Sequence, residues 1–141
     1  MIGVFVAAHG DFADGIVSAL GVIMGVPENV DTIGLRLGDA PDKFLEAADA
    51  KIAALDAASG GDGVLVLVDL FGGTPCNTVA RIMNERGLDH VRCVTGVSLP
   101  MLVEVVNERE DLGLAELERT ALEIGPGGVV SVAERFFPAV Q

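Results

Sequence analysis

Two residues that could do chemistry each end an apolar segment of the chain. His9 follows "IGVFVAA" at 2–8, and Asp69 closes "GVLVLVD" at 63–69. A carboxylate that accepts a hydrogen bond from one ring nitrogen of a histidine fixes the tautomer and the orientation of the ring. The other ring nitrogen is then free as a nucleophile or base. His9 and Asp69 are therefore the candidate catalytic pair, provided that the fold brings them together.

A glycine-rich turn after Asp69 predicts an anion site. Gly72 and Gly73 allow the backbone to approach a bound group closely. Thr74 is suited to cap a helix whose first residue is Pro75. Free amides at the start of this helix and the Thr74 hydroxyl could hold phosphate oxygens beside an imidazole. A histidine, a carboxylate and an anion pocket together indicate a phosphohistidine.

Apolar runs alternate with amphipathic segments along the whole chain. Runs rich in valine and isoleucine are typical of parallel strands covered on both faces, and apolar residues three and four apart predict helices. The four expected strands are 2–8, 30–37, 63–69 and 90–96. The expected helices contain Phe12, Ile16, Leu20 and Ile23; Phe44, Ala48, Ile52 and Leu55; Val79, Ile82 and Met83; Leu99, Leu102, Val103 and Val106; and Leu114, Leu117, Ala121 and Ile124.

This alternation predicts an α/β fold with an open, mainly parallel sheet and helices on both faces. If the strand order is 2-1-3-4, the first and third strands are neighbours and the chain leaves them in opposite directions. A crevice then opens beyond their carboxyl ends, where such folds bind ligands. His9 and Asp69 are expected to face each other in that crevice.

The end of the chain is harder to interpret. The sequence "GPGG" at 125–128 predicts a break after the fifth helix. The tail then reads as a short strand near 129–133, and a helix beginning near Val130 is the alternative.

Composition limits the class of protein. A chain of 141 residues without repeats predicts one domain, 1–141. With 9 Lys+Arg against 21 Asp+Glu, the formal charge of −12 is the wrong sign for binding nucleic acid. No apolar run approaches the roughly 18 residues that a membrane span needs, and no positive charge precedes the first apolar run. A cytoplasmic protein without direct membrane insertion is expected.

Several other chemistries lack their motifs. The chain has no GxGxxG, GxxxxGK[ST] or GxSxG pattern, so dinucleotide binding, nucleotide hydrolysis and serine hydrolysis lose their main support. His9, His90 and the thiols Cys76 and Cys93 share no ligand spacing. Neither a metal nor a cofactor is expected, and His90 is interpreted as a surface or turn residue.

A response-regulator receiver domain is the most instructive rival. Its sheet has the same strand order, and Asp69 occupies the position of a phosphoacceptor aspartate. Such chemistry needs magnesium held partly by acidic residues at the end of the first strand. This chain has Ala8 and His9 there instead. The imidazole is therefore the expected acceptor.

Three segments carry a family resemblance: "GVFVAAHGDFADGI", "GVLVLVDLFGGTPCNTVARI" and "TGVSLPMLVEVV". They resemble the IIA domain of mannose-type sugar phosphotransferase systems, which serve mannose, fructose and sorbose, and the likeness covers nearly the whole chain. The resemblance implies a phosphotransferase component that accepts a phosphoryl group from the phosphocarrier protein HPr on His9. It would pass this group to a IIB component, ahead of sugar uptake and phosphorylation.

The resemblance also implies roles for single residues. Nε2 of His9 is the expected phosphorylation site, with Asp69 on the Nδ1 side. Gly72, Gly73 and Thr74 would hold the phosphoryl oxygens.

Partner surfaces follow from the same resemblance. Phe71, which the sequence alone leaves as either a core residue or an exposed contact, is expected to touch partner proteins. Members of the family form homodimers by exchanging a carboxyl-terminal strand, which assigns the strand near 129–133 to the sheet of the partner. An association with membrane sugar permease subunits is also compatible with this role.

Two alternative functions share this fold. The domain could be the phosphotransfer subunit of a dihydroxyacetone kinase, or a regulatory module that senses phosphorylation without feeding transport. The "HG" and "FGGTP" motifs favour the sugar system over the kinase.

Overall fold

The computed structural model describes residues 1–140 and contains one parallel sheet. The strands lie in the order β2-β1-β3-β4, which confirms the α/β fold and the predicted order. Their bounds are β1 Gly3–His9, β2 Val30–Leu35, β3 Val64–Val68 and β4 Val91–Val94. One expected strand is shifted by one residue and the other three are two or three residues too long, which is the usual uncertainty at strand ends.

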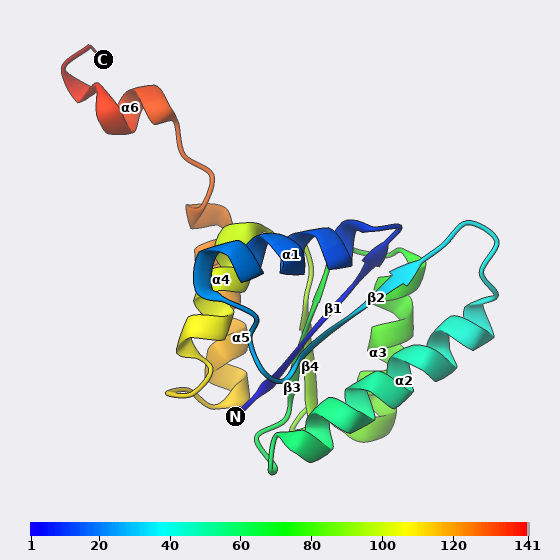
Figure 1. Cartoon of the computed structure of the whole chain (residues 1–141). Coiled ribbons are helices and arrows are strands. Elements are labelled where there is room, and N and C mark those ends of the chain that lie inside the picture. The colour runs from blue at the N-terminus through cyan, green and yellow to red at the C-terminus, as the bar shows by residue number, and fades with distance from the viewer. Residues whose placement is uncertain (141) are drawn as a thin grey trace.

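Helices cover both faces of the sheet (Figure 1). One face packs against α1 (Phe12–Met24), α4 (Leu99–Glu108) and α5 (Leu114–Gly127). The opposite face packs against α2 (Pro41–Ala58) and α3 (Thr74–Arg86). Among residues 1–140, no helix combines the length and the apolar character that a membrane crossing requires.

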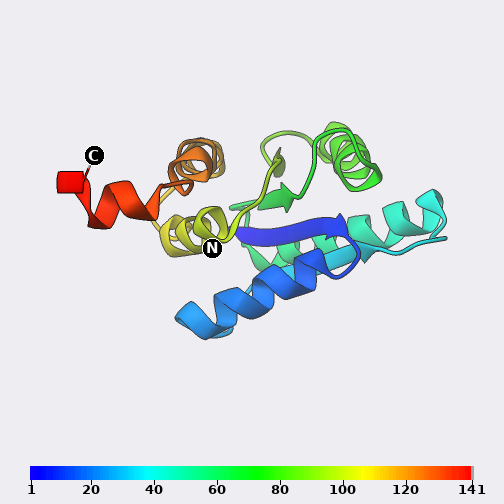
Figure 2. The same cartoon turned by 90° about the horizontal axis from the view of Figure 1, so that it is seen from above.

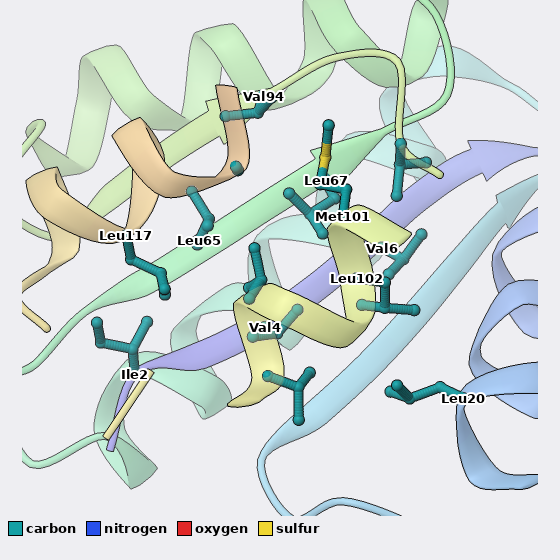
Figure 3. Packing of buried hydrophobic residues seen from close by; sticks show 14 of the residues in the cluster. Ile2, Val4, Val6, Leu20, Leu65, Leu67, Val94, Met101, Leu102 and Leu117 are labelled. Carbon is teal, nitrogen blue, oxygen red and sulfur yellow. The ribbon is translucent and has the colours of Figure 1, made fainter. Parts of the chain in front are cut away.

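The alternation of side chains along β1 explains its continuous apolar run. Val4 and Val6 belong to the apolar cluster beneath α1, α4 and α5, whereas Phe5 and Ala7 belong to the cluster beneath α2 and α3. Both faces are buried, so neither set of positions is polar. Figure 3 shows the first cluster, with the labelled residues Ile2, Val4, Val6, Leu20, Leu65, Leu67, Val94, Met101, Leu102 and Leu117. By the same alternation, His9 lies on the α2 and α3 side.

The sheet register brings three loops together at its carboxyl edge. β1 lies between β2 and β3, with His9 opposite Leu35 and Ala7 opposite Val68. The loops that follow β2 and β3 therefore flank the end of β1 on its two sides. Close packing here requires glycine at position 34, because a Cβ would lie 2.2 Å from the carbonyl oxygen of Gly10.

α5 ends within the predicted break at 125–128. It runs through Gly125 and Pro126 and ends at Gly127. A proline in the last turn removes one backbone hydrogen bond, which a helix tolerates near its end far better than in its middle. The helix therefore includes Gly125 and Pro126 and ends at the next residue, Gly127.

The strand expected near 129–133 is not formed. Residues 129–131 are irregular, and α6 (Val132–Phe136) follows, with a 3-10 turn at Pro138–Val140. Ser131 caps α6, since its Oγ accepts a hydrogen bond from the backbone N–H of Glu134 at 3.2 Å. The helical alternative is therefore correct, and α6 projects away from the body (Figures 1 and 2).

Candidate functional site

His9 and Asp69 meet at the carboxyl edge of the sheet, as predicted. Nδ1 of His9 lies 2.8 Å from Oδ2 of Asp69, and the backbone N–H of His9 donates to the same oxygen at 3.0 Å. The His9 side chain is 45% exposed, whereas that of Asp69 is 16% exposed. Two hydrogen bonds from one residue fix the carboxylate, and the carboxylate in turn fixes the ring.

The electrostatics of Asp69 favour its ionised form. Burial on its own opposes ionisation, but hydrogen bonds from the backbone and the ring of His9, together with the charge of that ring, lower the pKa of Asp69 below 3.8. The other oxygen, Oδ1, is buried and has no hydrogen-bond partner among residues 1–140. Oδ2 therefore carries the interaction with His9. An ionised Asp69 keeps a proton on Nδ1 and leaves Nε2 as the reactive nitrogen.

Gly73 lies directly beside that reactive nitrogen. A Cβ at this position would come within 2.9 Å of Cε1 and 3.3 Å of Nε2 of His9. Any side chain would therefore displace the ring. Gly72 precedes it with a φ of +85°, a conformation that glycine adopts without strain. Both predicted glycines are thus required, one by close approach and one by backbone conformation.

The start of α3 differs from the prediction by one residue. Gly73 is the N-cap in an extended conformation, and α3 begins at Thr74, with Pro75 in its second position. The carbonyl of Gly73 accepts the first helical hydrogen bond, from the N–H of Asn77 at 2.9 Å. The Thr74 hydroxyl is consequently not used for capping. Gly73 takes the N-cap position without a side-chain cap hydrogen bond.

Asn77 is a site residue that the sequence analysis missed. Its Nδ2 donates to the carbonyl of Gly72 at 3.2 Å, and its backbone N–H binds the carbonyl of Gly73. The side chain thus ties the first turn of α3 to the loop that carries the glycines. The signal was present in "DLFGGTPCN", since an amide in the first turn of a helix can reach back to the preceding loop.

The arrangement places a helix N-terminus next to a ring nitrogen that has a free lone pair. The amino-terminal end of a helix carries a partial positive charge and unpaired amides. α3 presents this end at Gly73 and Thr74, beside Nε2 of His9. An imidazole with one free nitrogen, an ionised carboxylate behind it and a helix N-terminus in front of it can accept and hold a phosphoryl group.

The loop between β3 and α3 also carries an exposed aromatic residue. The Phe71 side chain is 81% exposed, which resolves the choice between core residue and surface contact in favour of the surface. Its neighbour Leu70 is 58% exposed. Phe12, at the start of α1, is 46% exposed. The segments that follow β1 and β3 therefore each carry exposed large apolar residues.

Of the remaining candidates, Cys76 lies in the first turn of α3, beside the site, and His90 lies away from it. His90 precedes β4, and its Nδ1 lies 3.3 Å from Oδ2 of Asp56 at the end of α2, a partner that the sequence did not reveal. Burial raises the pKa of the Cys93 thiol to about 12, and Cys76 is half-buried. Within residues 1–140, no group of three or more His, Cys, Asp or Glu side chains is placed to hold a metal ion.

Sequence comparisons connect this geometry with known proteins. The sequence model of a family described as "PTS system fructose IIA component" matches residues 3–122. The chain is 34% identical over 129 residues to the "PTS system mannose-specific EIIAB component" of Escherichia coli K12, an alignment that covers 91% of the chain but 38% of that longer protein. It is also 34% identical to the "PTS system fructose-specific EIIA component" of Bacillus subtilis, over 83% of the chain and 77% of that protein.

Solved structures show the same architecture. A phosphotransferase system component EIIA from Streptococcus agalactiae superposes with a TM-score of 0.84 at 29% identity, covering 94% of this chain and 98% of that one. A mannose/sorbose specific IIA subunit from Enterococcus faecalis gives a TM-score of 0.75 at 26% identity, with 93% and 94% covered.

Proposed function

Because the chain belongs to the family of phosphotransferase-system IIA components of the mannose, fructose and sorbose type, we propose that it carries a phosphoryl group on His9 between two other proteins. The donor is HPr and the acceptor is a IIB component. The domain spans 1–141, acts in the cytoplasm and serves sugar uptake through membrane permease subunits.

One observation carries this proposal. Nδ1 of His9 is held by Asp69 at 2.8 Å, while Nε2 faces Gly73 at the N-terminus of α3. The ring therefore presents a single nitrogen, and it presents that nitrogen to the positive end of a helix. Such an arrangement suits a nucleophile that must receive an anion.

The transfer step follows from these contacts. The lone pair of Nε2 attacks the phosphorus atom, a new nitrogen–phosphorus bond forms, and the bond to the donor's imidazole breaks, returning its electron pair to the donor. The Asp69 carboxylate stabilises the positive character that the His9 ring acquires and keeps its proton on Nδ1. The backbone at Gly72 and Gly73 and the Thr74 hydroxyl hold the phosphoryl oxygens. Catalysis then depends on positioning and electrostatics.

Transfer to the acceptor is the same step in reverse. The acceptor's nucleophile attacks phosphorus, and the electron pair of the broken bond returns to Nε2. Both partners must dissociate after each transfer, so the affinity for each is modest. Phe71 is the proposed contact for them, because it is exposed in the loop beside the reactive ring.

A homodimer is part of the proposal. The segment 129–140 exposes Val129, Phe136 and Phe137, at 87%, 75% and 59%, and projects from the body of the protein (Figure 1). Exposed apolar residues on a projecting segment are expected to be covered in the assembly. Exchange of this segment between two copies covers it. Sedimentation of the full chain and of a chain ending at 128 tests this, with a dimer expected for the first and a monomer for the second.

Phosphorylation by labelled phospho-HPr tests the function itself. We expect the wild type and a His90→Ala variant to be labelled equally and His9→Ala not to be labelled. The label is expected to be lost in acid and kept in alkali, as for a phosphoramidate, whereas an acyl phosphate on an aspartate would be lost in alkali. Label that persists in His9→Ala would refute the assignment. Passage of the label to a purified IIB protein distinguishes a transport carrier from a regulatory module.

A further inference from the structure

A cleft separates the beginnings of α2 and α3, the two helices that cover the same face of the sheet. Its volume is about 450 Å³, within the range of about 300–1,000 Å³ that is usual for small-molecule sites. Further along, an ion pair between Nε of Arg86 and Oδ1 of Asp49, at 2.8 Å, joins the two helices. The helices are thus held together beyond the cleft and form its two walls.

The wall on α3 is a polar stripe. Thr74, Thr78 and Arg81 follow one another at spacings of four and three residues, so they lie on one face of the helix. All three line the cleft, as does Asn77 beside them. A ligand along this wall would therefore meet two hydroxyl groups, an amide and a guanidinium.

Thr78 is the residue that points most directly to a ligand. It is only 8% exposed, and the structure gives its hydroxyl no hydrogen bond within residues 1–140. Buried polar groups are nearly always hydrogen-bonded, because a buried group without a partner destabilises the fold. Since Thr78 lines the cleft, a molecule bound there can supply the missing partner.

Arg81 supplies a cation to the same stripe. Its Nε lies 3.3 Å from Oε1 of Glu85, one turn further along α3, and both side chains are exposed. An exposed pair of this kind contributes little to stability. The guanidinium can therefore exchange the carboxylate for a phosphate group, to which it donates two parallel hydrogen bonds.

The wall on α2 restricts the kind of ligand. Pro41 and Leu45 offer an apolar surface, and Asp42 lies between them in the sequence. The Asp42 carboxylate can accept hydrogen bonds from hydroxyl groups but repels a phosphate, which leaves Arg81 as the place for one. Among residues 1–140, no aromatic side chain on which a nucleobase could stack lines the cleft.

We propose that the cleft between α2 and α3 binds a monosaccharide phosphate. The phosphate group accepts two hydrogen bonds from Arg81, and the hydroxyl groups of the sugar bond to Thr78 and Asp42. The apolar C–H face of the sugar packs on Pro41 and Leu45. No bond in the ligand is made or broken, so the cleft is a binding site and not a second active site.

The cleft is coupled to the phosphotransfer site through the start of α3. Thr74 lines the cleft and follows Gly73, which lies against the His9 ring. A phosphoryl group on His9 and the phosphate of the ligand would repel each other along this helix. Phosphorylation of His9 therefore weakens the binding of the monosaccharide phosphate. This coupling rests on the phosphocarrier function proposed above, whereas the binding site does not.

Nuclear magnetic resonance titration of the full chain tests the site. The probes are the 6-phosphates of glucose, mannose and fructose, with glucose and inorganic phosphate as partial ligands. We expect at least one hexose phosphate to bind with a Kd below about 1 mM and to shift the amide signals of the residues that line the cleft. Glucose and inorganic phosphate should each bind at least about tenfold more weakly, because each makes only part of the contacts. Equal binding of inorganic phosphate, or no binding of any hexose phosphate, would overturn the proposal.

Two substitutions test the contacts of the ligand. Arg81→Gln and Thr78→Val should each raise the Kd for the hexose phosphate about tenfold, since each removes hydrogen bonds to it. Thr78→Ser keeps the hydroxyl and should stay within about threefold of the wild type. Thr78→Val should not lower the melting temperature, because the hydroxyl that it removes has no partner in the free protein. If Arg81→Gln and Thr78→Val both bind like the wild type, the ligand lies elsewhere.

α5 offers a matched control on the other face of the sheet. A cleft of about 340 Å³ there is also lined by an arginine and a threonine, Arg119 and Thr120, but together with Glu116 and Glu123. These carboxylates repel a phosphate group. Arg119→Gln and Thr120→Val should therefore leave the Kd for the hexose phosphate unchanged, and a loss of binding in either would contradict the placement between α2 and α3.

Failure of this site is distinguishable from failure of the proposed function. If hexose phosphates bind but HPr does not phosphorylate His9, the function is wrong and the site stands. If HPr phosphorylates His9 but no hexose phosphate binds, the site is wrong and the function stands. If both occur, titration of the phosphorylated protein should give a Kd about fivefold higher than that of the free protein. An unchanged Kd would show that the two sites are not coupled.

Discussion

The protein contains two histidine–aspartate pairs whose local geometry is similar. Nδ1 of His9 lies 2.8 Å from Asp69, and Nδ1 of His90 lies 3.3 Å from Asp56. The histidine side chains are 45% and 55% exposed, and the aspartates 16% and 20%. In both aspartates Oδ1 is buried without a hydrogen-bond partner among residues 1–140. The pairing alone does not make a phosphoryl site.

The backbone around the two pairs differs in electrical sign. His9 ends β1 and faces Gly73, where α3 begins and carries a partial positive charge. Asp56 lies in the last turn of α2, where a helix carries a partial negative charge, and it holds His90 there. A phosphoryl group on His90 would meet that negative end. The position of a pair on the α/β sheet therefore decides what the pair can do.

The largest difference between the pairs is expected when each loses its carboxylate charge. Asp69→Asn should slow phosphoryl transfer from HPr about a thousandfold. Without the carboxylate charge, the tautomer of the His9 ring is no longer fixed, and the positive charge that the ring acquires during transfer is no longer stabilised. Asp56→Asn should leave the transfer rate unchanged. Rapid quench of labelled transfer measures both, and circular dichroism establishes that both variants fold. Equal rates for the wild type and Asp69→Asn would remove the distinction between the pairs.

Gly73 tests the space in front of the reactive nitrogen. Gly73→Ala places a Cβ 2.9 Å from Cε1 of His9 and displaces the ring. A displacement of this size should slow transfer about a hundredfold. Gly113 is the N-cap of α5 in nearly the same conformation, with φ and ψ of −77° and 167° against −78° and 172° at Gly73. There a Cβ meets Glu116 at an ordinary 3.6 Å, so Gly113→Ala should transfer like the wild type.

Acidification shows the stabilisation that the Asp69 carboxylate provides. Its pKa in the folded protein lies below 3.8, so its contribution to stability is present above about that pH and is lost as the pH falls through the folded-state pKa. The difference in free energy of unfolding between the wild type and Asp69→Asn should therefore shrink on acidification below 3.8. Urea titrations at a series of pH values measure it. A difference that grows toward acid pH would show that the ionised form is not the one stabilised.

Much of the fold and of the primary site follows from local sequence patterns. The apolar run of β3 is buried on both faces, and Phe44, Ala48, Ile52 and Leu55 of α2 are all buried as their spacing predicts. The strand order then brings His9 to Asp69, because parallel strands end at the same edge. Each inference uses a periodicity or a topological rule that acts along the chain.

The features that could not be predicted depend either on contacts between residues far apart in the sequence or on segments that suit a strand and a helix almost equally well. Asp56 meets His90 across 34 positions of sequence, and no pattern marks that contact. The need for glycine at position 73 comes from the ring of His9, which is far away in the chain. The valines of the tail favour a strand, whereas Ser131 can cap a helix, and the structure has the capped helix α6.

The smallest effect is expected for the His90 pair itself. His90 is largely exposed and its partner lies at 3.3 Å, a geometry that contributes at most about 1 kcal/mol to stability. His90→Ala and Asp56→Asn should therefore each lower the free energy of unfolding by no more than about 1 kcal/mol, measured by urea denaturation at neutral pH. The double variant should lose little beyond the larger single effect, because either substitution already breaks the pair. A much larger loss, or any change in phosphorylation of His9, would mean that the second pair is coupled to the first and that the two ends of the sheet do not act independently.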